Sequence, residues 1–426
     1  MTYKEGPTSE NTWRAWLAIS GASTGLFCTV GFLNSFGIFQ EYYATNQLAE
    51  SSQSTIAWLG ASSLFFLFSI SVVSGSMLDT LGPRLPLCLG SIGTVLSVMM
   101  TSICKEFYQF LLAQGVLLGI SMSLVTWPML ALVGQHIKRK RALAMGIVLA
   151  GSSLGGVIWP IAIDKLLKSP RIGFPWTMRI VGFIMIPCLA FSCVTARSPK
   201  VPRKYVENAN PSQRLTSDNA INETKDRKRK TEVIALLHKP EMQLLCLAMF
   251  ITYFGMLSPF FYTTSYAADK NFPSSFGFYT VSIVNGASFF GRILPGIVAD
   301  KYGKFNCCII STLVAGIVAL CWTKVESMAG LGVWAAAYGF ASGGILSLQQ
   351  ACAAQVATTS TLGLAIGTVT GSTAISAMAN VPISGALVEK YGYTSLSIFS
   401  GVSLLLGGML LSAARLAQNR KLTAVV

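Results

Sequence analysis

The chain alternates long apolar runs with short polar connections along its whole length. Each run holds about 20 mainly apolar residues, the length at which an α-helix crosses the ~30 Å hydrocarbon core of a bilayer. The pattern therefore predicts an all-α membrane protein with twelve transmembrane helices. The expected spans are Leu17–Gln40, Ile56–Leu78, Leu85–Cys104, Phe107–Val133, Ala142–Leu166, Trp176–Ala196, Leu236–Ala267, Phe276–Ala299, Asn306–Trp322, Ala329–Val356, Leu362–Val388 and Leu396–Ala414.

A polar, basic segment between the sixth and seventh runs divides the spans into two groups of six. This segment covers residues 197–233 and contains the run KDRKRK. We expect one six-helix bundle over residues 14–196 and a second over 234–414, with an N-terminal segment 1–13 and a tail 415–426. The linker is interpreted as a cytoplasmic tether that helps to set the orientation of the bundles.

The basic residues orient the two bundles. With both termini in the cytoplasm, the connections on that side hold 23 of the 32 Lys and Arg residues, and the opposite side holds seven. Positive charge accumulates on the cytoplasmic side of membrane proteins, so both termini are expected there. The formal net charge of +15 then reflects topology and does not indicate a nucleic-acid partner.

The composition limits the chemistry that the chain can perform. Charged residues make up 12% of the chain, against about 25% in a soluble protein. The ten cysteines and two histidines lack the spacing of a metal site, so no metal and no cofactor are expected. The spans contain no nucleophile–base pair and no phosphate-binding loop, which argues against an enzyme and against an ATP-driven pump.

The two halves carry the same short motif at equivalent cytoplasmic hairpins. GSMLDTLGPR follows the second span and GIVADKYGKF follows the eighth, and their shared G-x-x-x-D-x-x-G positions are 221 residues apart. Parallel repeats of this kind suit a transporter that rocks its halves around a site between them. The motif residues are Gly75, Asp79, Gly82 and Arg84 in the first copy, and Gly296, Asp300, Gly303 and Lys304 in the second.

The residue types of this motif suggest a gate. Glycine allows neighbouring helices to approach closely, and an aspartate at a helix end can cap the N-terminus of a neighbouring helix or pair with a basic residue. Such a contact can hold the cytoplasmic side closed in one state and release it in another. The alternative is that the aspartates only mark helix ends.

The paired motifs resemble the signature loops of the major facilitator superfamily. HIKRKRALAMGIVLAGSSLGG in span five is similar to the signature of the monocarboxylate porter family, and GFLNSFGIFQEYY and YQFLLAQGVLLGISM resemble its fungal branch. The resemblance covers essentially all twelve spans and implies transport of a small-molecule substrate. The matching residues after the basic cluster of span five are Leu143, Ala144, Gly146, Ala150 and Gly151.

The chain departs from the proton-coupled members of that family at two positions. Those members carry a lysine in span one and an aspartate one turn before the span-eight arginine, where this chain has Ile38 and Ser288; the arginine is retained as Arg292. No span holds Asp, Glu or His near its middle, where a proton relay needs a titratable group. We expect either no coupling through a mid-membrane carboxylate or coupling through an outer-end acid such as Asp164 or Glu41.

Arg292 is the leading candidate for a substrate-binding residue. It precedes Asp300 by eight residues, which places it ~12 Å from the cytoplasmic helix end and near the midplane. A guanidinium there can offer a fork to a carboxylate, or it can be a structural arginine that is held by backbone carbonyls. Asn34, Asn285 and Tyr262 are further candidates for the cavity lining.

Three local sequences predict features of the surrounding helices. Pro259 is expected to break span seven and to free carbonyl groups for a ligand or water. The stretches GSSLGG (residues 151–156) and GLAIGTVTG (residues 363–371) carry small residues four apart. We interpret them as sliding interfaces between the two halves.

The leading hypothesis is a secondary transporter of a small organic anion or secondary metabolite that works by alternating access as a monomer, with efflux slightly favoured. Uptake of a monocarboxylate or vitamin-like nutrient is the alternative direction. A non-transporting nutrient sensor is the alternative of another class. The plasma membrane is the expected location, and an organelle membrane the alternative.

Overall fold

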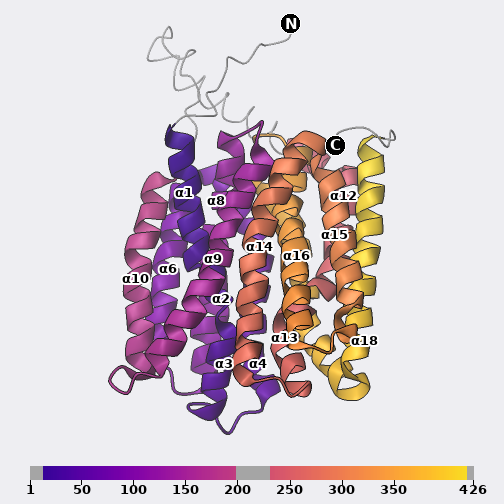
Figure 1. The fold of residues 1–426 in the computed structure, drawn as a ribbon. Helices are drawn as coiled ribbons and strands as arrows, with labels where there is room; N and C mark the ends of the chain where they lie inside the picture. The colour runs from indigo at the N-terminus through magenta and orange to yellow at the C-terminus, as the bar shows by residue number, and fades with distance from the viewer. Residues whose placement is uncertain (1–12, 198–230, 420–426) are drawn as a thin grey trace, which may run out of the picture.

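The structure is a bundle of long helices that run side by side (Figure 1). The computed structural model describes residues 13–197 and 231–419. Ten helical segments in this part of the chain are long and apolar enough to cross a membrane. The ninth span, α15 (Lys304–Leu320), is a shorter apolar helix, and a kink at Gly392 (φ 76°) divides α18 between spans eleven and twelve. Together they make the predicted twelve.

Each half contributes six spans in the order that the apolar runs predict. The predicted linker and terminal segments lie largely outside the described residues. In the N-terminal half the helices are α1 (Trp13–Cys28), α2 (Val30–Leu33), α3 (Phe36–Thr45), α4 (Gln53–Ser69), α5 (Ser71–Leu81), α6 (Arg84–Thr101), α7 (Phe107–Phe110), the π-helical η1 (Leu111–Leu117), α8 (Leu118–His136), α9 (Arg141–Leu167) and α10 (Gly173–Thr195). In the C-terminal half they are α12 (Pro240–Met256), α13 (Ser258–Asp269), α14 (Ser274–Tyr302), α15, the 3₁₀ helix η2 (Trp322–Lys324), α16 (Met328–Val356), α17 (Leu362–Ser372) and α18 (Ala374–Gln418).

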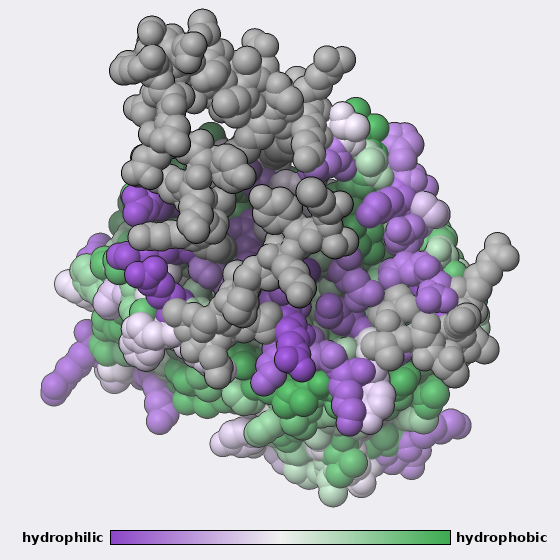
Figure 2. Space-filling model, turned by 90° about the horizontal axis from the view of Figure 1, so that it is seen from above, coloured by the Kyte–Doolittle hydropathy of each residue, from purple (hydrophilic) through white to green (hydrophobic). Residues whose placement is uncertain are grey.

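Both described chain ends and the ends of the predicted basic linker lie at one face of the bundle (Figure 1). Seen from that side, hydrophilic residues gather over the helix ends and hydrophobic residues lie toward the rim (Figure 2). We call this the cytoplasmic face, because it carries the excess of Lys and Arg. The helices α9 and α14 run side by side along the junction between the halves.

The predicted break in span seven is present, but its carbonyl groups are already bonded by protein. Helix α12 ends at Met256 and α13 begins at Ser258. Three side chains donate to three consecutive carbonyls at the break: Asn380 to Phe254, Ser400 to Gly255 and Tyr338 to Met256. The expectation that these carbonyls are free for a ligand is therefore wrong, because other helices of the same half satisfy them.

The two small-residue stretches play different parts. A side chain at Gly151 would collide with the Ser23 carbonyl, and one at Gly155 would approach the Phe27 carbonyl to 2.6 Å. Gly151 and Gly155 of GSSLGG therefore pack against span one of their own half, while Ser152 and Gly156 meet Arg292 and Asn285 of the other half, so only part of this stretch forms the expected interface. Gly363 and Gly367 do face the other half, where they meet the backbone of α5 at the Gly75 and Ser71 carbonyls.

Candidate functional site

Asp79 caps a helix of the opposite half. The residue lies near the cytoplasmic end of α5, and its carboxylate accepts hydrogen bonds from the backbone N–H of Gly363 at 3.1 Å and of Leu364 at 2.9 Å. These donors belong to the first turn of α17, where N–H groups have no intrahelical partner. A carboxylate at this position is stabilised by charge-assisted bonds and by the helix dipole.

Asp300 makes the equivalent contact in the reverse direction. It lies near the cytoplasmic end of α14, and its carboxylate accepts from the N–H groups of Ala142 and Leu143 at 3.0 Å each. Ala142 and Leu143 precede Gly363 and Leu364 by 221 positions, the same interval that separates the two aspartates. Each half therefore caps a helix of the other, and the repeat in the sequence corresponds to a reciprocal contact in the structure.

The glycines of the motif make room for these caps. A side chain at Gly75 would collide with the Gly363 carbonyl, and one at Gly296 would come within 2.8 Å of the Ala142 carbonyl. Gly82 (φ 78°) and Gly303 (φ 100°) end α5 and α14 in a backbone conformation that other residues rarely adopt. The four glycines thus bring two pairs of helices close together and turn the chain at their ends.

The basic positions of the two motif copies are not equivalent. Arg84 is exposed at the start of α6 and does not join the capping contacts, although the sequence grouped it with the gate. Lys304 is half-buried and interacts electrostatically with Asp300 and Arg141. Arg141 donates to the Ala354 carbonyl at 2.7 Å, which adds a third link between the halves at the cytoplasmic face.

Arg292 bridges the halves deeper in the bundle. Its side chain is 4% exposed, and Nη1 donates to the Leu149 carbonyl at 2.5 Å and to the Ser152 hydroxyl, both on α9. Its Nε is buried and has no hydrogen-bond partner among the described residues. One edge of the guanidinium therefore fastens α14 to α9, which agrees with the alternative that Arg292 is a structural arginine held by backbone carbonyls. The Nε–H on the other edge remains available as a charged donor.

The position equivalent to Arg292 shows how the two halves differ. Ser71 precedes Arg292 by 221 residues, and its hydroxyl donates to the Gly367 carbonyl at 2.7 Å across the junction. Both positions therefore link the halves by hydrogen bonds to opposing backbone. Only the C-terminal copy carries a buried positive charge, which a structural link does not require.

Asn34 and Asn285 meet beside this bridge. The Asn34 amide nitrogen lies 3.5 Å from the Asn285 amide oxygen and 3.5 Å from the Ser152 carbonyl oxygen. The Asn285 amide nitrogen donates to the Val281 carbonyl within its own helix. Two of the predicted lining residues and Arg292 therefore converge around Ser152 of α9.

Tyr262 stands apart from this group in its bonding. Its hydroxyl donates to the Val381 carbonyl of α18 at 3.0 Å, a contact within the C-terminal half. Ser288 packs against Gly343 of α16 and is fully buried, and its hydroxyl has no hydrogen-bond partner among the described residues. Among the described residues, neither side chain forms a hydrogen bond with Ser152 or with the three side chains that meet around it, Asn34, Asn285 and Arg292.

The sequence prediction missed a second polar contact near Arg292. Gln349 on α16 donates to the Tyr253 hydroxyl of α12 at 2.8 Å, and Tyr253 interacts electrostatically with Arg292. The Tyr253 ring packs edge-on against Phe68 of the opposite half, with centroids 5.6 Å apart. The sequence feature that could have revealed this contact is the pair of adjacent amides, Gln349 and Gln350, in an otherwise apolar span. Polar residues within a membrane span usually mark a functional or structural polar cluster.

The outer-end acid Asp164 is held in an ion pair. Its carboxylate lies 2.8 Å from the Lys168 ammonium one turn later on the chain. The hydrogen bond and charge of Asp164 raise the pKa of Lys168. Glu41 also interacts electrostatically with Lys168, so both candidate coupling acids lie near the same ammonium.

The meeting of the two asparagines depends on the small residue opposite them. A side chain at Gly156 would approach Asn34 Nδ2 and Asn285 Oδ1 to 2.8 Å each. We expect Gly156→Val to separate the amides and to lower transport by about fivefold to tenfold, equivalent to ~1–1.4 kcal/mol. Gly156→Ala adds only one methyl group, so its transport rate should fall between those of the wild type and Gly156→Val. Unchanged transport by both variants would contradict a role for this contact.

Comparisons with known proteins cover almost the whole chain. Residues 15–328 match the family described as Major Facilitator Superfamily. The chain is 42% identical over 407 residues to an MFS-type transporter of Aspergillus fumigatus, covering 96% of this chain and 93% of the relative. It is 40% identical over 410 residues to the agnestins efflux protein of Paecilomyces divaricatus (96% and 89% covered). It is 37% identical over 412 residues to the aspyridones efflux protein of Emericella nidulans (96% and 79% covered).

Solved structures share the fold at low sequence identity. The proton:xylose symporter XylE bound to 6-bromo-6-deoxy-D-glucose superposes with a TM-score of 0.74 at 14% identity, covering 94% of this chain and 95% of that chain. The human organic anion transporter MFSD10 superposes with a TM-score of 0.69 at 16% identity, covering 96% and 100%. At such identities the likeness speaks for the arrangement of helices alone.

Proposed function

Because the chain belongs to the major facilitator superfamily, we propose that it exports a small organic product of the kind made by fungal secondary metabolism, by alternating access. It is an integral, multi-pass membrane protein. The efflux proteins for agnestins and aspyridones, similar over 96% of the chain, support the direction and the substrate class. A monomer in the plasma membrane is the simplest form for such export.

The observation that carries the mechanism is the reciprocal pair of aspartate caps. Asp79 and Asp300 each bond the first turn of a helix in the other half. These contacts link the two halves at the cytoplasmic face, and export requires that face to open for loading. We propose that the caps release in the loading state and form again when the substrate faces outward.

Arg292 supplies the substrate charge in this proposal. Its Nη1 is bonded to α9, and its buried Nε lacks a partner. A carboxylate or enolate oxygen of the substrate fits that free donor and lowers the cost of burying the charge. The Asn34–Asn285 pair next to Ser152 offers neutral amides to the same ligand.

Within the superfamily, we place the chain with the monocarboxylate porter family. The span-five sequence around Gly146 and Gly151, the retained Arg292, and the paired cytoplasmic motifs support this assignment. Ser288 and Ile38 replace the acid and the lysine of proton-coupled members. We therefore propose that coupling, if present, does not use a mid-membrane carboxylate.

The decisive experiment is expression of the intact protein in a yeast host, with extracellular and intracellular metabolites compared against a vector control. Export predicts that a fed organic acid or secondary metabolite leaves cells faster and that its intracellular level falls. Faster accumulation inside cells would favour the uptake alternative. A nutrient-dependent change in host gene expression without solute movement would favour the sensor and contradict transport.

A further inference from the structure

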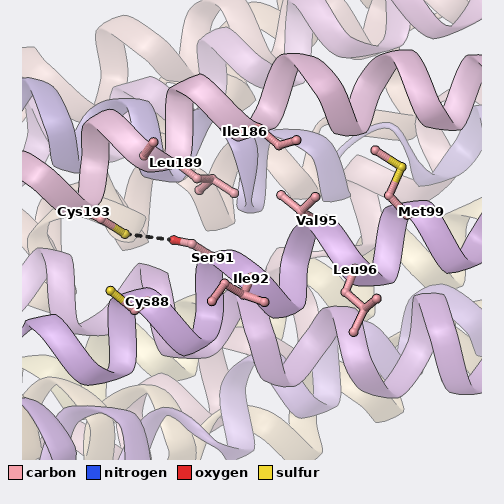
Figure 3. Close-up of a pocket in the computed structure, with 10 residues that line it drawn as sticks. Cys88, Ser91, Ile92, Val95, Leu96, Met99, Ile186, Leu189 and Cys193 are labelled. Carbon is pink, nitrogen blue, oxygen red and sulfur yellow. Dashed lines mark hydrogen bonds between the residues drawn. The ribbon is translucent and has the colours of Figure 1, made fainter.

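An apolar groove lies on the outer surface of the N-terminal half, between α6 and α10. It has a volume of about 490 Å³. Figure 3 shows Val95 of α6 pointing toward Ile186 and Leu189 of α10, and Ile92 and Leu96 of α6 also line the groove. Ile92 is 67% exposed and Leu96 is 50% exposed, so the groove opens away from the bundle, toward the hydrocarbon of the membrane.

The polar groups inside the groove satisfy each other. The Ser91 hydroxyl and the Cys193 thiol lie 3.2 Å apart (Figure 3). The groove therefore offers little hydrogen bonding to an occupant, and its remaining lining is almost entirely hydrocarbon. An occupant within it must be a flexible or flat apolar group.

The position of the groove along the helices limits it to one leaflet. Its lining on α6 extends from Cys88 to Met99, a rise of ~16 Å at ~1.5 Å per residue. Helix α6 begins at the cytoplasmic face with Arg84, and α10 ends there with Thr195. The groove thus covers about the inner half of a ~30 Å hydrocarbon core, which is the depth of the cytoplasmic leaflet.

Two arginines stand at its cytoplasmic end. Arg84 precedes Cys88 by four residues on α6 and therefore lies on the same helical face. Arg197 follows the end of α10, and both residues are exposed. Neither guanidinium has a hydrogen bond or ion pair with another residue in the described ranges. Asp79, the carboxylate nearest in sequence, is engaged by α17.

We propose that this groove and the two arginines bind an anionic phospholipid of the cytoplasmic leaflet. One acyl chain fills the space between α6 and α10, and the phosphate accepts hydrogen bonds from Arg84 and Arg197. A second copy of the chain is a poorer occupant, because it would place its own arginines against Arg84 and Arg197 at the cytoplasmic end of the groove. An uncharged lipid would leave both guanidiniums without an anion.

The second half provides an internal control. Lys304, the basic residue of the second motif copy, lies one position before the equivalent of Arg84; it is half-buried and interacts with Asp300. It is therefore directed to the gate and away from headgroups. Ile310 on the equivalent helix α15 is 61% exposed and is a suitable position for a matched control substitution.

Native mass spectrometry of the purified full chain tests the proposal directly. The protein is equilibrated with equal amounts of phosphatidylinositol and phosphatidylcholine, and the retained lipids are counted. We expect preferential retention of phosphatidylinositol by the wild type. The Arg84→Gln/Arg197→Gln variant should lose that preference by about tenfold or more, and Arg84→Lys/Arg197→Lys should recover most of it, since each basic group contributes near an anionic surface.

A groove-filling variant separates this site from general lipid contact. Val95→Phe should reduce retention of phosphatidylinositol, whereas Ile310→Phe on α15 should not. Lipid should also slow alkylation of the exposed thiol of Cys88 at the groove, measured on its own peptide. Equal retention of both lipids, or retention of a sterol instead, would overturn the proposal. So would phosphatidylinositol retention that is unchanged in both the arginine variants and the groove-filling variant, measured on monodisperse protein.

Discussion

The double variant Asp79→Ala/Asp300→Ala is expected to lower net export by roughly tenfold to several hundredfold. Each aspartate accepts two N–H groups at a helix N-terminus in the opposite half. Loss of such a cap costs about 0.5–2 kcal/mol, and each ~1.4 kcal/mol changes an equilibrium tenfold. Because both caps hold the same closed face, their losses add, and the transporter should accumulate in the state that is open to the cytoplasm.

The buried thiol of Cys352 provides the measurement. It is 0% exposed and lies on α16 two residues before Ala354, which accepts the Arg141 link. Opening of the cytoplasmic face should increase its alkylation in inside-out vesicles, quantified on its own peptide. Cys321, exposed at the opposite end of the bundle, serves as the reference thiol.

The single variants test whether the contact is reciprocal. Asp79→Ala and Asp300→Ala should each produce about half of the free-energy shift in Cys352 labelling. Thr80→Ala, at an exposed neighbouring residue, should leave labelling and export unchanged. A large effect of one aspartate and none of the other would contradict a gate that is built from two equivalent caps.

The sequence predicted the helices well because membrane spans are long and compositionally distinct. It also located the two aspartates and their glycines, because these residues recur at one interval. It could not show that each aspartate bonds the other half. A repeat indicates that two residues occupy equivalent positions, but it does not identify the groups with which they form hydrogen bonds. Arg84 and Lys304 illustrate this limit, since each is the basic residue that follows its motif copy and yet they differ in burial.

The substrate region was harder to predict, for a physical reason. Helical periodicity places Asn285 and Arg292 on one face of α14, but it does not show which helix that face meets. Ser152, more than 130 residues away, bonds Arg292, and Asn380 and Tyr338 occupy carbonyls that Pro259 was expected to free. Contacts between distant segments depend on packing that local patterns do not contain.

Replacement of Arg292 by alanine is expected to reduce transport of an anionic substrate by roughly tenfold to a hundredfold. The variant removes the Nη1 bonds to Leu149 and Ser152 as well as the free Nε donor. Hydrogen bonds to charged groups contribute about 1.5–3 kcal/mol each. Arg292→Lys should retain part of the activity, because an ammonium keeps the charge but cannot hold α9 and a ligand with one rigid fork.

Ser152→Ala distinguishes the two roles of this arginine. It removes one bond between α14 and α9 and leaves the Nε edge in place, so it should affect an anionic substrate and its neutral ester alike. Arg292→Ala should raise the KM for the anion much more than for the ester, because only the anion uses the free donor. If Arg292→Ala lowers transport of both compounds equally and increases Cys352 labelling, the arginine acts as a fastening between the halves and does not bind substrate.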